Sequence, residues 1–160
     1  MEKNLIVLCL DGALAKSAAN LLADSLDMYF LDINDSINYN LQVSAIKQKI
    51  GIKYLNSQIK GLIKNSCTYE NTVINLPFEF FLKPDIQKIV LNSNSIIFHI
   101  EIDKQCLQDK KSNINIDKIP KIAFDEYIQL LKNAANVNIE YNGQTMCNLA
   151  EQIKESLKNQ

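Results

Sequence analysis

The chain contains no arginine, because all 17 of its basic residues are lysines. A guanidinium presents a planar fork of donors that grips carboxylate or phosphate through two hydrogen bonds, and an ammonium cannot copy that geometry. Any site for such groups must therefore rely on lysine. The chain also holds 22 isoleucines and 19 asparagines. This composition is typical of an AT-rich genome, in which isoleucine, lysine and asparagine codons are favoured.

Long apolar runs and paired cysteines are also missing. The first apolar run, residues 5–10, is too short for a signal peptide or a membrane span, and Asp11 ends it. The four cysteines form no C-x-x-C pair, which argues against a zinc site or a disulfide framework (Cys9, Cys67, Cys106 and Cys147). A net charge of −1 argues against a nucleic-acid surface. We therefore expect a cytoplasmic protein without a membrane or nucleic-acid partner.

Length and composition favour one domain over residues 1–160, because 47% of the residues are hydrophobic and no linker or repeat divides the chain. Short, mainly apolar strands alternate with amphipathic helices. We expect strands over residues 4–10, 29–32, 72–76, 95–101 and 137–141, and helices over residues 16–26, 46–63, 85–91, 124–134 and 145–157. The second of these helices should break near Gly51.

This alternation predicts an α/β fold, in which helices cover both faces of a five-stranded parallel sheet in three layers. Ligands of such folds bind beyond the carboxyl ends of the strands. The segments that follow the first three strands should meet at that edge: residues 11–17, the turn after Asp32, and residues 77–79. The polar stretch at residues 110–121 lacks sustained periodicity and is interpreted as a loop that could act as a lid.

The segment from Leu10 to Ser17 ends like a phosphate-binding loop. The pattern G-x-x-x-x-G-K-[ST] uses glycines to bring backbone N–H groups onto phosphate oxygens, and its lysine and hydroxyl supply charge and a Mg²⁺ ligand. Here Leu10 and Ala15 fill both glycine positions, while Lys16 and Ser17 remain. Gly12 lies off the pattern. We expect a distorted nest for a nucleotide, formed by Gly12, Ala13, Ala15, Lys16 and Ser17.

The spacing from Lys16-Ser17 to Phe30-Leu31-Asp32-Ile33-Asn34 resembles that of shikimate kinases. The resemblance covers nearly the whole chain and continues through residues 51–56, 77–79, 83–85, 135–137 and 142–143 to the final helix. The resemblance implies a P-loop kinase fold. It also implies an enzyme that transfers the γ-phosphate of ATP to the 3-hydroxyl of shikimate, with Mg²⁺ as cofactor. Lys16 and Asp32 would then be catalytic, Ser17 and Asp32 would hold the metal, and the substrate would contact Asn34, Asn56, Phe78 and Lys118.

Several positions depart from the family pattern. Asn34 stands where the family has an aspartate that binds the hydroxyls, and asparagine is a poor general base. Asn56 occupies the position of the carboxylate-binding arginine, and Pro77-Phe78-Glu79 replaces a triple glycine. The arginine-proline pair of the lid appears as Ile119-Pro120, which leaves Lys118 and Lys121 as the nearest cations. The helix after the lid also lacks its nucleotide-contacting arginine.

Each retained residue also has a purely structural interpretation. Ser17 could belong to the first helical turn, Asp32 could cap the turn after its strand, and Asp11 could pair with Lys16 in place of a ligand. His99 lies in an apolar strand without a partner at motif spacing, so we assign it no role.

Three functions remain open. We favour a shikimate-kinase-like protein with degenerate ATP and acceptor sites and weak or no kinase activity. The alternatives are an active divergent shikimate kinase and a small-molecule kinase for another acceptor.

Overall fold

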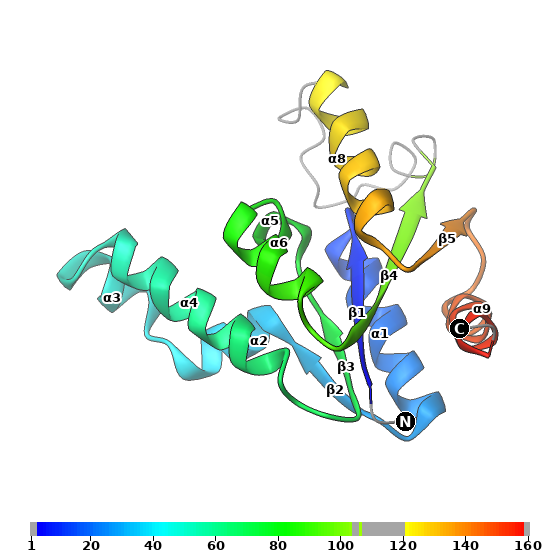
Figure 1. The fold of residues 1–160 in the computed structure, drawn as a ribbon, viewed down its shortest axis with the longest axis horizontal. Helices are drawn as coiled ribbons and strands as arrows, with labels where there is room; N and C mark the ends of the chain where they lie inside the picture. Colours follow the sequence, from blue (N-terminus) through cyan, green and yellow to red (C-terminus); the bar gives the residue numbers. More distant parts are fainter. Residues whose placement is uncertain (1–2, 104–105, 107–120, 159–160) are drawn as a thin grey trace.

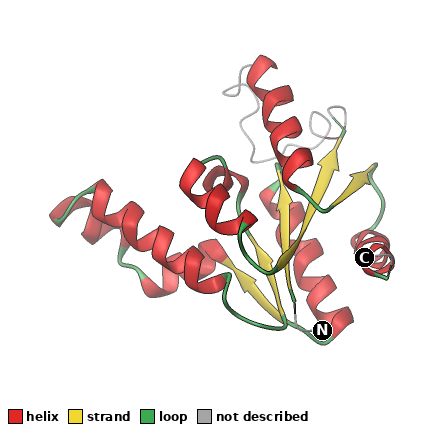
Figure 2. Cartoon of the chain, viewed as in Figure 1, coloured by secondary structure: helices red, strands yellow, loops and turns green. Residues whose placement is uncertain are grey.

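Five strands form one parallel sheet in the order β2-β3-β1-β4-β5. The structure, a computed structural model, describes residues 3–103, 106 and 121–158 (Figure 1). All the arrows in Figure 2 run toward the same edge of the sheet. The strand bounds are β1 Asn4–Cys9, β2 Tyr29–Asp32, β3 Thr72–Asn75, β4 Ser95–Ile102 and β5 Val137–Tyr141. The parallel five-stranded sheet confirms the fold class expected from the sequence.

Helices cover both faces of this sheet. On one side α1 and α9 pack against each other, while α5, α6 and α8 lie over the other side (Figure 1). The helices are α1 Gly12–Leu26, α2 Ile33–Asn40, α3 Val43–Lys49, α4 Ile52–Ser66, α5 Phe78–Phe81, α6 Pro84–Leu91, α8 Lys121–Ala134 and α9 Met146–Leu157. No helix in the described part of the chain is long and apolar enough to cross a membrane.

The core forms around β1, in which all six residues are buried. Small side chains on α1 allow that helix to lie close to its neighbours, because alanine adds little bulk beyond the backbone. They are Ala15, Ala18, Ala19 and Ala23, each at most 1% exposed. The apolar face of α4 closes the opposite layer through Leu55, Ile59 and Ile63. Continuous apolar character in the central strand and helical spacing in the outer layers thus agree with a doubly covered parallel sheet.

The structure differs from the sequence-based predictions at three places. The helix expected from residue 16 begins at Gly12, because Ala13, Leu14 and Ala15 favour helix and Asp11 is a good N-cap. The turn expected after Asp32 is the start of α2 instead. Residues 78–81, for which no helix or strand is expected from the sequence, form the short helix α5. The break at Gly51 is confirmed, with φ at +115° between α3 and α4. Of the expected lid, residues 110–120 lie outside the described residues, and Lys118 lies there with them.

Asn4 ties the start of β1 to the loop that leads into β3. Its side chain is 2% exposed, its Nδ2 donates to the Tyr69 carbonyl, and its Oδ1 accepts from the Thr72 backbone N–H at 3.1 Å. One buried amide therefore satisfies two backbone groups at the amino-terminal edge of the sheet. A side chain that could not hydrogen-bond would leave the buried Thr72 N–H unpaired and would remove the partner of the Tyr69 carbonyl.

We expect Asn4→Ala to lower the free energy of unfolding by about 2–3 kcal/mol, since each unpaired buried group costs on the order of 1–3 kcal/mol. Urea denaturation followed by circular dichroism measures this change. The matched control is Asn20→Ala on the exposed surface of α1, which should shift stability by no more than about 0.5 kcal/mol. Equal effects of the two substitutions would contradict the role given to Asn4.

Candidate functional site

Polar side chains gather where β1, β2 and β3 end. Asp32 is the last residue of β2 and lies beside Asn75, the last residue of β3, in the sheet register. Asp11 follows β1, the next strand along, two residues after its end. All three side chains are buried, at 5%, 3% and 8% exposure respectively. The carboxyl edge of the sheet thus holds two carboxylates and one amide within a small region.

The carboxylate of Asp11 caps the amino terminus of α1. Its Oδ1 accepts hydrogen bonds from the backbone N–H groups of Ala13 and Leu14, both at 3.0 Å. The Asp11 carbonyl accepts the first helical bond from Ala15 at 2.9 Å. These N–H groups at the positive end of a helix are the ones to which a phosphate would otherwise bind. The chain therefore supplies its own anion at this position.

No loop of the length that phosphate binding needs remains between β1 and α1. Only Leu10 and Asp11 lie outside regular structure, while Gly12 through Ser17 are helical. Gly12 has a negative φ and open space where a Cβ would lie, so neither backbone conformation nor crowding requires a glycine there. Ala13, Lys16 and Ser17 are exposed, and Ala15 is buried. The assignment of these residues to nucleotide binding stays a prediction, and the backbone cradle of that motif is not formed.

Lys16 pairs with Asp35 rather than with Asp11. The two groups lie 2.6 Å apart, Lys16 Nζ to Asp35 Oδ2, on an exposed part of α1 and α2. The hydrogen bond to Asp35 raises the pKa of Lys16, and the nearby charge of Asp32 acts in the same direction. The ammonium that would approach a phosphate is therefore already held by a carboxylate nineteen residues away.

Asp32 serves the fold directly. Its Oδ1 accepts from the Asp35 backbone N–H at 2.8 Å, which caps α2, and its Oδ2 accepts from Asn75 Nδ2 at 2.7 Å. This agrees with the capping interpretation considered from the sequence. Asn75 Oδ1 is buried, and no group in the described residues hydrogen-bonds it. The Asp32–Asn75 pair thus links β2 to β3 and leaves one acceptor unsatisfied.

The residues predicted to contact the phosphoryl acceptor do not line one common surface. Asn34 on α2 and Asn56 on α4 are both exposed, and the side chain of neither forms a hydrogen bond within the described residues. Phe78 is 7% exposed, so its ring packs into the core. Glu79, beside it on α5, is exposed. Their assignment to substrate binding stays a prediction.

These contacts indicate whether the residues at the carboxyl edge could hold ATP and Mg²⁺. The amides of Ala13 and Leu14 in the first turn of α1 already donate to Asp11, and the motif lysine already binds Asp35. Both oxygens of Asp32 accept hydrogen bonds, and the hydroxyl of Ser17 lies on the exposed face of α1. A triphosphate at this helix end would compete with the Asp11 carboxylate for the Ala13 and Leu14 amides. The residues at the carboxyl edge of the sheet therefore do not fit a Mg-ATP ligand.

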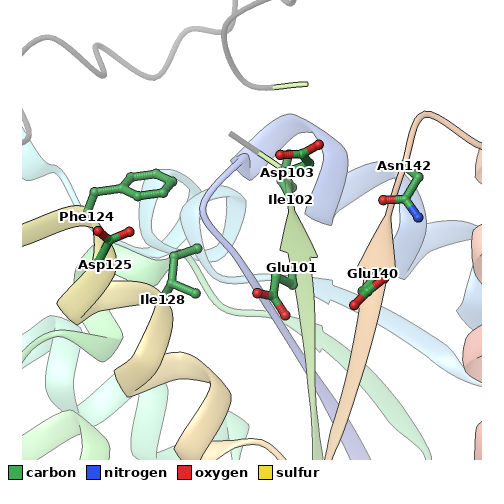
Figure 3. Close-up of a pocket in the computed structure, with 8 residues that line it drawn as sticks. All are labelled: Glu101, Ile102, Asp103, Phe124, Asp125, Ile128, Glu140 and Asn142. Atoms are coloured by element: carbon green, nitrogen blue, oxygen red, sulfur yellow. The ribbon is translucent and has the colours of Figure 1, made fainter. Parts of the chain in front are cut away.

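A cavity of about 390 Å³ opens between the ends of β4 and β5 and the helix α8 (Figure 3). Glu101 and Glu140 lie on the two strands, and Asp125 lies on α8, the helix where the resemblance places a nucleotide-contacting arginine. Lys132 pairs with Glu101 at 2.8 Å. The complete lining is Glu101, Ile102, Asp103, Phe124, Asp125, Ile128, Glu140 and Asn142. Four carboxylates thus line the cavity, and one of them, that of Glu101, is paired with a lysine.

Sequence reasoning missed three contributors to this edge. Asp35 follows Asp32 by three residues, a spacing at which the second residue can lie in the first turn of a capped helix. The N-cap role of Asp11 had a local signal too, because an aspartate precedes a run of good helix formers. Asn75 carried no signal, since nothing in an apolar strand indicates which residue will face its neighbour's carboxylate.

The fold defines a class: α/β proteins in which helices cover both faces of an all-parallel, five-stranded sheet. Within that class the chain is similar to shikimate kinases. It matches the enzyme from Acinetobacter baumannii, solved in complex with shikimate, with a TM-score of 0.77 and 14% identity over 99% of this chain and 94% of the other. It matches the Aquifex aeolicus shikimate kinase with a TM-score of 0.76 and 16% identity over 98% of this chain and 96% of the other.

A sugar kinase from Janibacter is more distant, with a TM-score of 0.59 and 12% identity over 99% of this chain and 95% of the other. No protein-family model matches the sequence, and no curated protein matches it either. Identities of this size show the fold, and they leave the chemistry to be argued from the residues. The fold expected from the resemblance to shikimate kinases is confirmed.

His99 lies inside β4, away from this edge, and is fully buried. Its Nδ1 lies 3.0 Å from Asn138 Oδ1, so the proton is assigned to Nδ1, and Nε2 has no hydrogen-bond partner among the described residues. Burial lowers the pKa of His99 below its usual 6.5, because a charged imidazolium would lose its hydration. The folded protein therefore holds this side chain neutral.

We expect the free energy of unfolding to fall as the pH drops below about 6.5, because the unfolded chain then binds a proton that the folded chain refuses. The loss should end once the pH passes below the pKa of His99 in the folded state. His99→Leu should remove this slope, whatever its effect on stability at neutral pH. Urea denaturation between about pH 5 and 7.5 measures it. His99 is the sole histidine, so the same slope in both proteins would rule out this origin.

Proposed function

We propose that the chain is a non-catalytic protein with a shikimate-kinase-like fold, in which Asp11 stands where the phosphates of a nucleotide would bind. The observation that carries the proposal is the pair of 3.0 Å hydrogen bonds from the Ala13 and Leu14 amides to Asp11 Oδ1. Kinase activity is accordingly weak or absent. The chain keeps the architecture of the enzymes and uses the positive end of α1 for its own stability.

The repulsion expected between the Asp11 carboxylate and a phosphate is large enough to support this proposal. Two unit charges about 4 Å apart repel by about 4 kcal/mol at an effective dielectric constant near 20. A repulsion of this size lowers affinity roughly a thousandfold, even before the two existing hydrogen bonds are broken. Phosphate binding therefore requires Asp11 to leave, and the cap that it provides is worth about 1 kcal/mol to the helix. Both effects act against a nucleotide.

The requirements of phosphoryl transfer point the same way. Such transfer depends on cations that neutralise the developing charge and on a residue that orients the acceptor hydroxyl. Lys16 is engaged by Asp35, Asn34 replaces the family aspartate, and no arginine exists in the chain to supply a planar fork. Activity would need several of these contacts to rearrange together.

We expect isothermal titration calorimetry with Mg-ATP to give no binding heat, with or without shikimate. The reason is that the helix amides and Lys16 already have intramolecular partners. Saturable heat with Mg-ATP would contradict the proposal and favour one of the two kinase alternatives. Heat that further depended on shikimate would favour the divergent shikimate kinase, whereas ATP binding alone would favour another acceptor.

Removing the carboxylate of Asp11 should create an anion site. We expect inorganic phosphate to raise the melting temperature of Asp11→Ala more than that of the unaltered protein, although the variant itself loses about 1 kcal/mol of helix capping. Differential scanning calorimetry at increasing phosphate concentration measures both effects.

The matched control is Asp11→Asn, whose amide oxygen still caps the helix without a charge. If occupation of the amides is what matters, this variant should respond to phosphate like the unaltered protein. A response equal to that of Asp11→Ala would mean that charge repulsion alone excludes anions. No response in either variant would overturn the view that this helix end is a suppressed phosphate site.

A further inference from the structure

Residues 42–66 form an arm that extends away from the sheet. The arm consists of α3, the connection at Gly51 and α4, and α3 with the first part of α4 extends to one side of the molecule (Figure 1). The inner part of α4 packs on the core through Leu55, Ile59 and Ile63, whereas α3 contains no buried residue. The outer end of the arm therefore contributes little to the core and presents its side chains to the surroundings.

Large apolar side chains are exposed at this outer end. Ile50 and Ile52 lie on either side of Gly51 and are 61% and 51% exposed, and Tyr54 is 45% exposed. The positive φ of Gly51 turns the chain sharply between the two helices, which places both isoleucines at one bend. Single exposed apolar residues are common on surfaces, whereas Ile50, Ile52 and Tyr54 together form a small apolar patch at a projecting bend.

The same region carries only positive charge. Residues 36–69 contain five lysines and no aspartate or glutamate, although the whole chain has a net charge of −1. Lys47, Lys49 and Lys53 flank the exposed isoleucines and are themselves exposed. None of these three lysines forms an ion pair within the described residues. The outer end of the arm thus combines uncompensated positive charge with aliphatic surface.

We propose that this arm tip, formed by Lys47, Lys49, Ile50, Ile52, Lys53 and Tyr54, binds the surface of an anionic lipid bilayer. Lysines are attracted to acidic headgroups, and aliphatic side chains enter the boundary between headgroups and acyl chains. Tyrosine suits the same interface, because its ring is apolar and its hydroxyl is polar. This inference is independent of whether the sheet edge binds a nucleotide.

The two isoleucines favour a bilayer over the other anionic partners. A nucleic acid would use the lysines and could stack on Tyr54, but it offers no apolar phase in which Ile50 and Ile52 could be buried. The tip is also a projecting bend rather than a groove, so it can enter a soft, flat surface without a matching cavity. With one bend and three nearby lysines, binding should be weak, reversible and sensitive to salt.

Co-sedimentation with vesicles tests the proposal. We expect the full chain to sediment with vesicles of mixed phosphatidylcholine and phosphatidylglycerol and to remain in solution with phosphatidylcholine alone. Ile50→Ser combined with Ile52→Ser should weaken binding by about tenfold or more. Lys47→Glu combined with Lys49→Glu should weaken it comparably. High salt should release the unaltered protein.

The matched control combines Leu91→Ser with Lys158→Glu. Leu91 is 52% exposed on α6, close to the exposure of Ile52, and both control residues lie outside the arm. This variant should bind like the unaltered protein. Circular dichroism establishes that each variant keeps its fold, as expected for exposed positions.

Insertion of the tip can be observed directly, because the chain has no tryptophan. The emission of Ile52→Trp should shift to shorter wavelength when vesicles containing phosphatidylglycerol are added, while that of Leu91→Trp should not change. Absence of sedimentation with anionic vesicles would overturn the proposal. So would equal loss in the control variant, or the same shift in both tryptophan variants. Binding only to a single-stranded oligonucleotide, or only self-association, would likewise replace the bilayer with another partner.

Discussion

Two backbone N–H groups at the start of α1 donate to the carboxylate of Asp11, and the arrangement of the whole carboxyl edge depends on this cap. Because the helix starts at Gly12, the connection from β1 is too short to fold around a ligand. Lys16 then belongs to the second turn of the helix, where it reaches Asp35 on α2.

From Asp35 the contacts continue across the sheet. The backbone of Asp35 is held by Asp32, and Asp32 in turn binds Asn75 at the end of β3. A connected set of polar contacts therefore joins the ends of three strands and two helices. In an enzyme of this fold class, groups at this edge would be kept available for substrate. Here most of them are hydrogen-bonded or ion-paired to one another, which supports the non-catalytic function proposed above.

Much of the fold could be predicted from the sequence, because it follows from hydrophobic spacing. The strand bounds of β4 and β5 and the break at Gly51 depend on local residue order, and β1 is identified by its unbroken apolar run. The contacts of the candidate site were harder to predict from the sequence, because they join residues that are distant in the chain. Lys16 is nineteen residues from Asp35, and Asp32 is 43 residues from Asn75.

The start of α1 was mispredicted for a different reason. Similarity to a phosphate-binding loop outweighed the helix preference of Ala13 to Ala15. Where glycines are replaced by good helix formers behind an aspartate, local propensity is the better guide.

Net charge proved a poor description of this molecule. A net charge of −1 argues against binding polyanions. This value is the sum of an arm that holds five lysines and no acidic residue and a remainder in which acidic residues outnumber basic ones. The acidic cavity beside α8 and the lysine-bearing arm tip lie on different parts of the structure. Only the fold shows that the two charges are separated in space rather than interleaved.

The cap on α1 also determines how the protein responds to its surroundings. A carboxylate two and three residues from its partners acts at a very high effective concentration, because no translational freedom is lost when it binds. A protein that completes such a site with a soluble ligand gains stability in proportion to the logarithm of that ligand's concentration. In this chain the anion at the helix end is instead the Asp11 side chain, which is part of the same polypeptide. Under the function proposed above, the stability of this helix end does not depend on the nucleotide concentration in the cell.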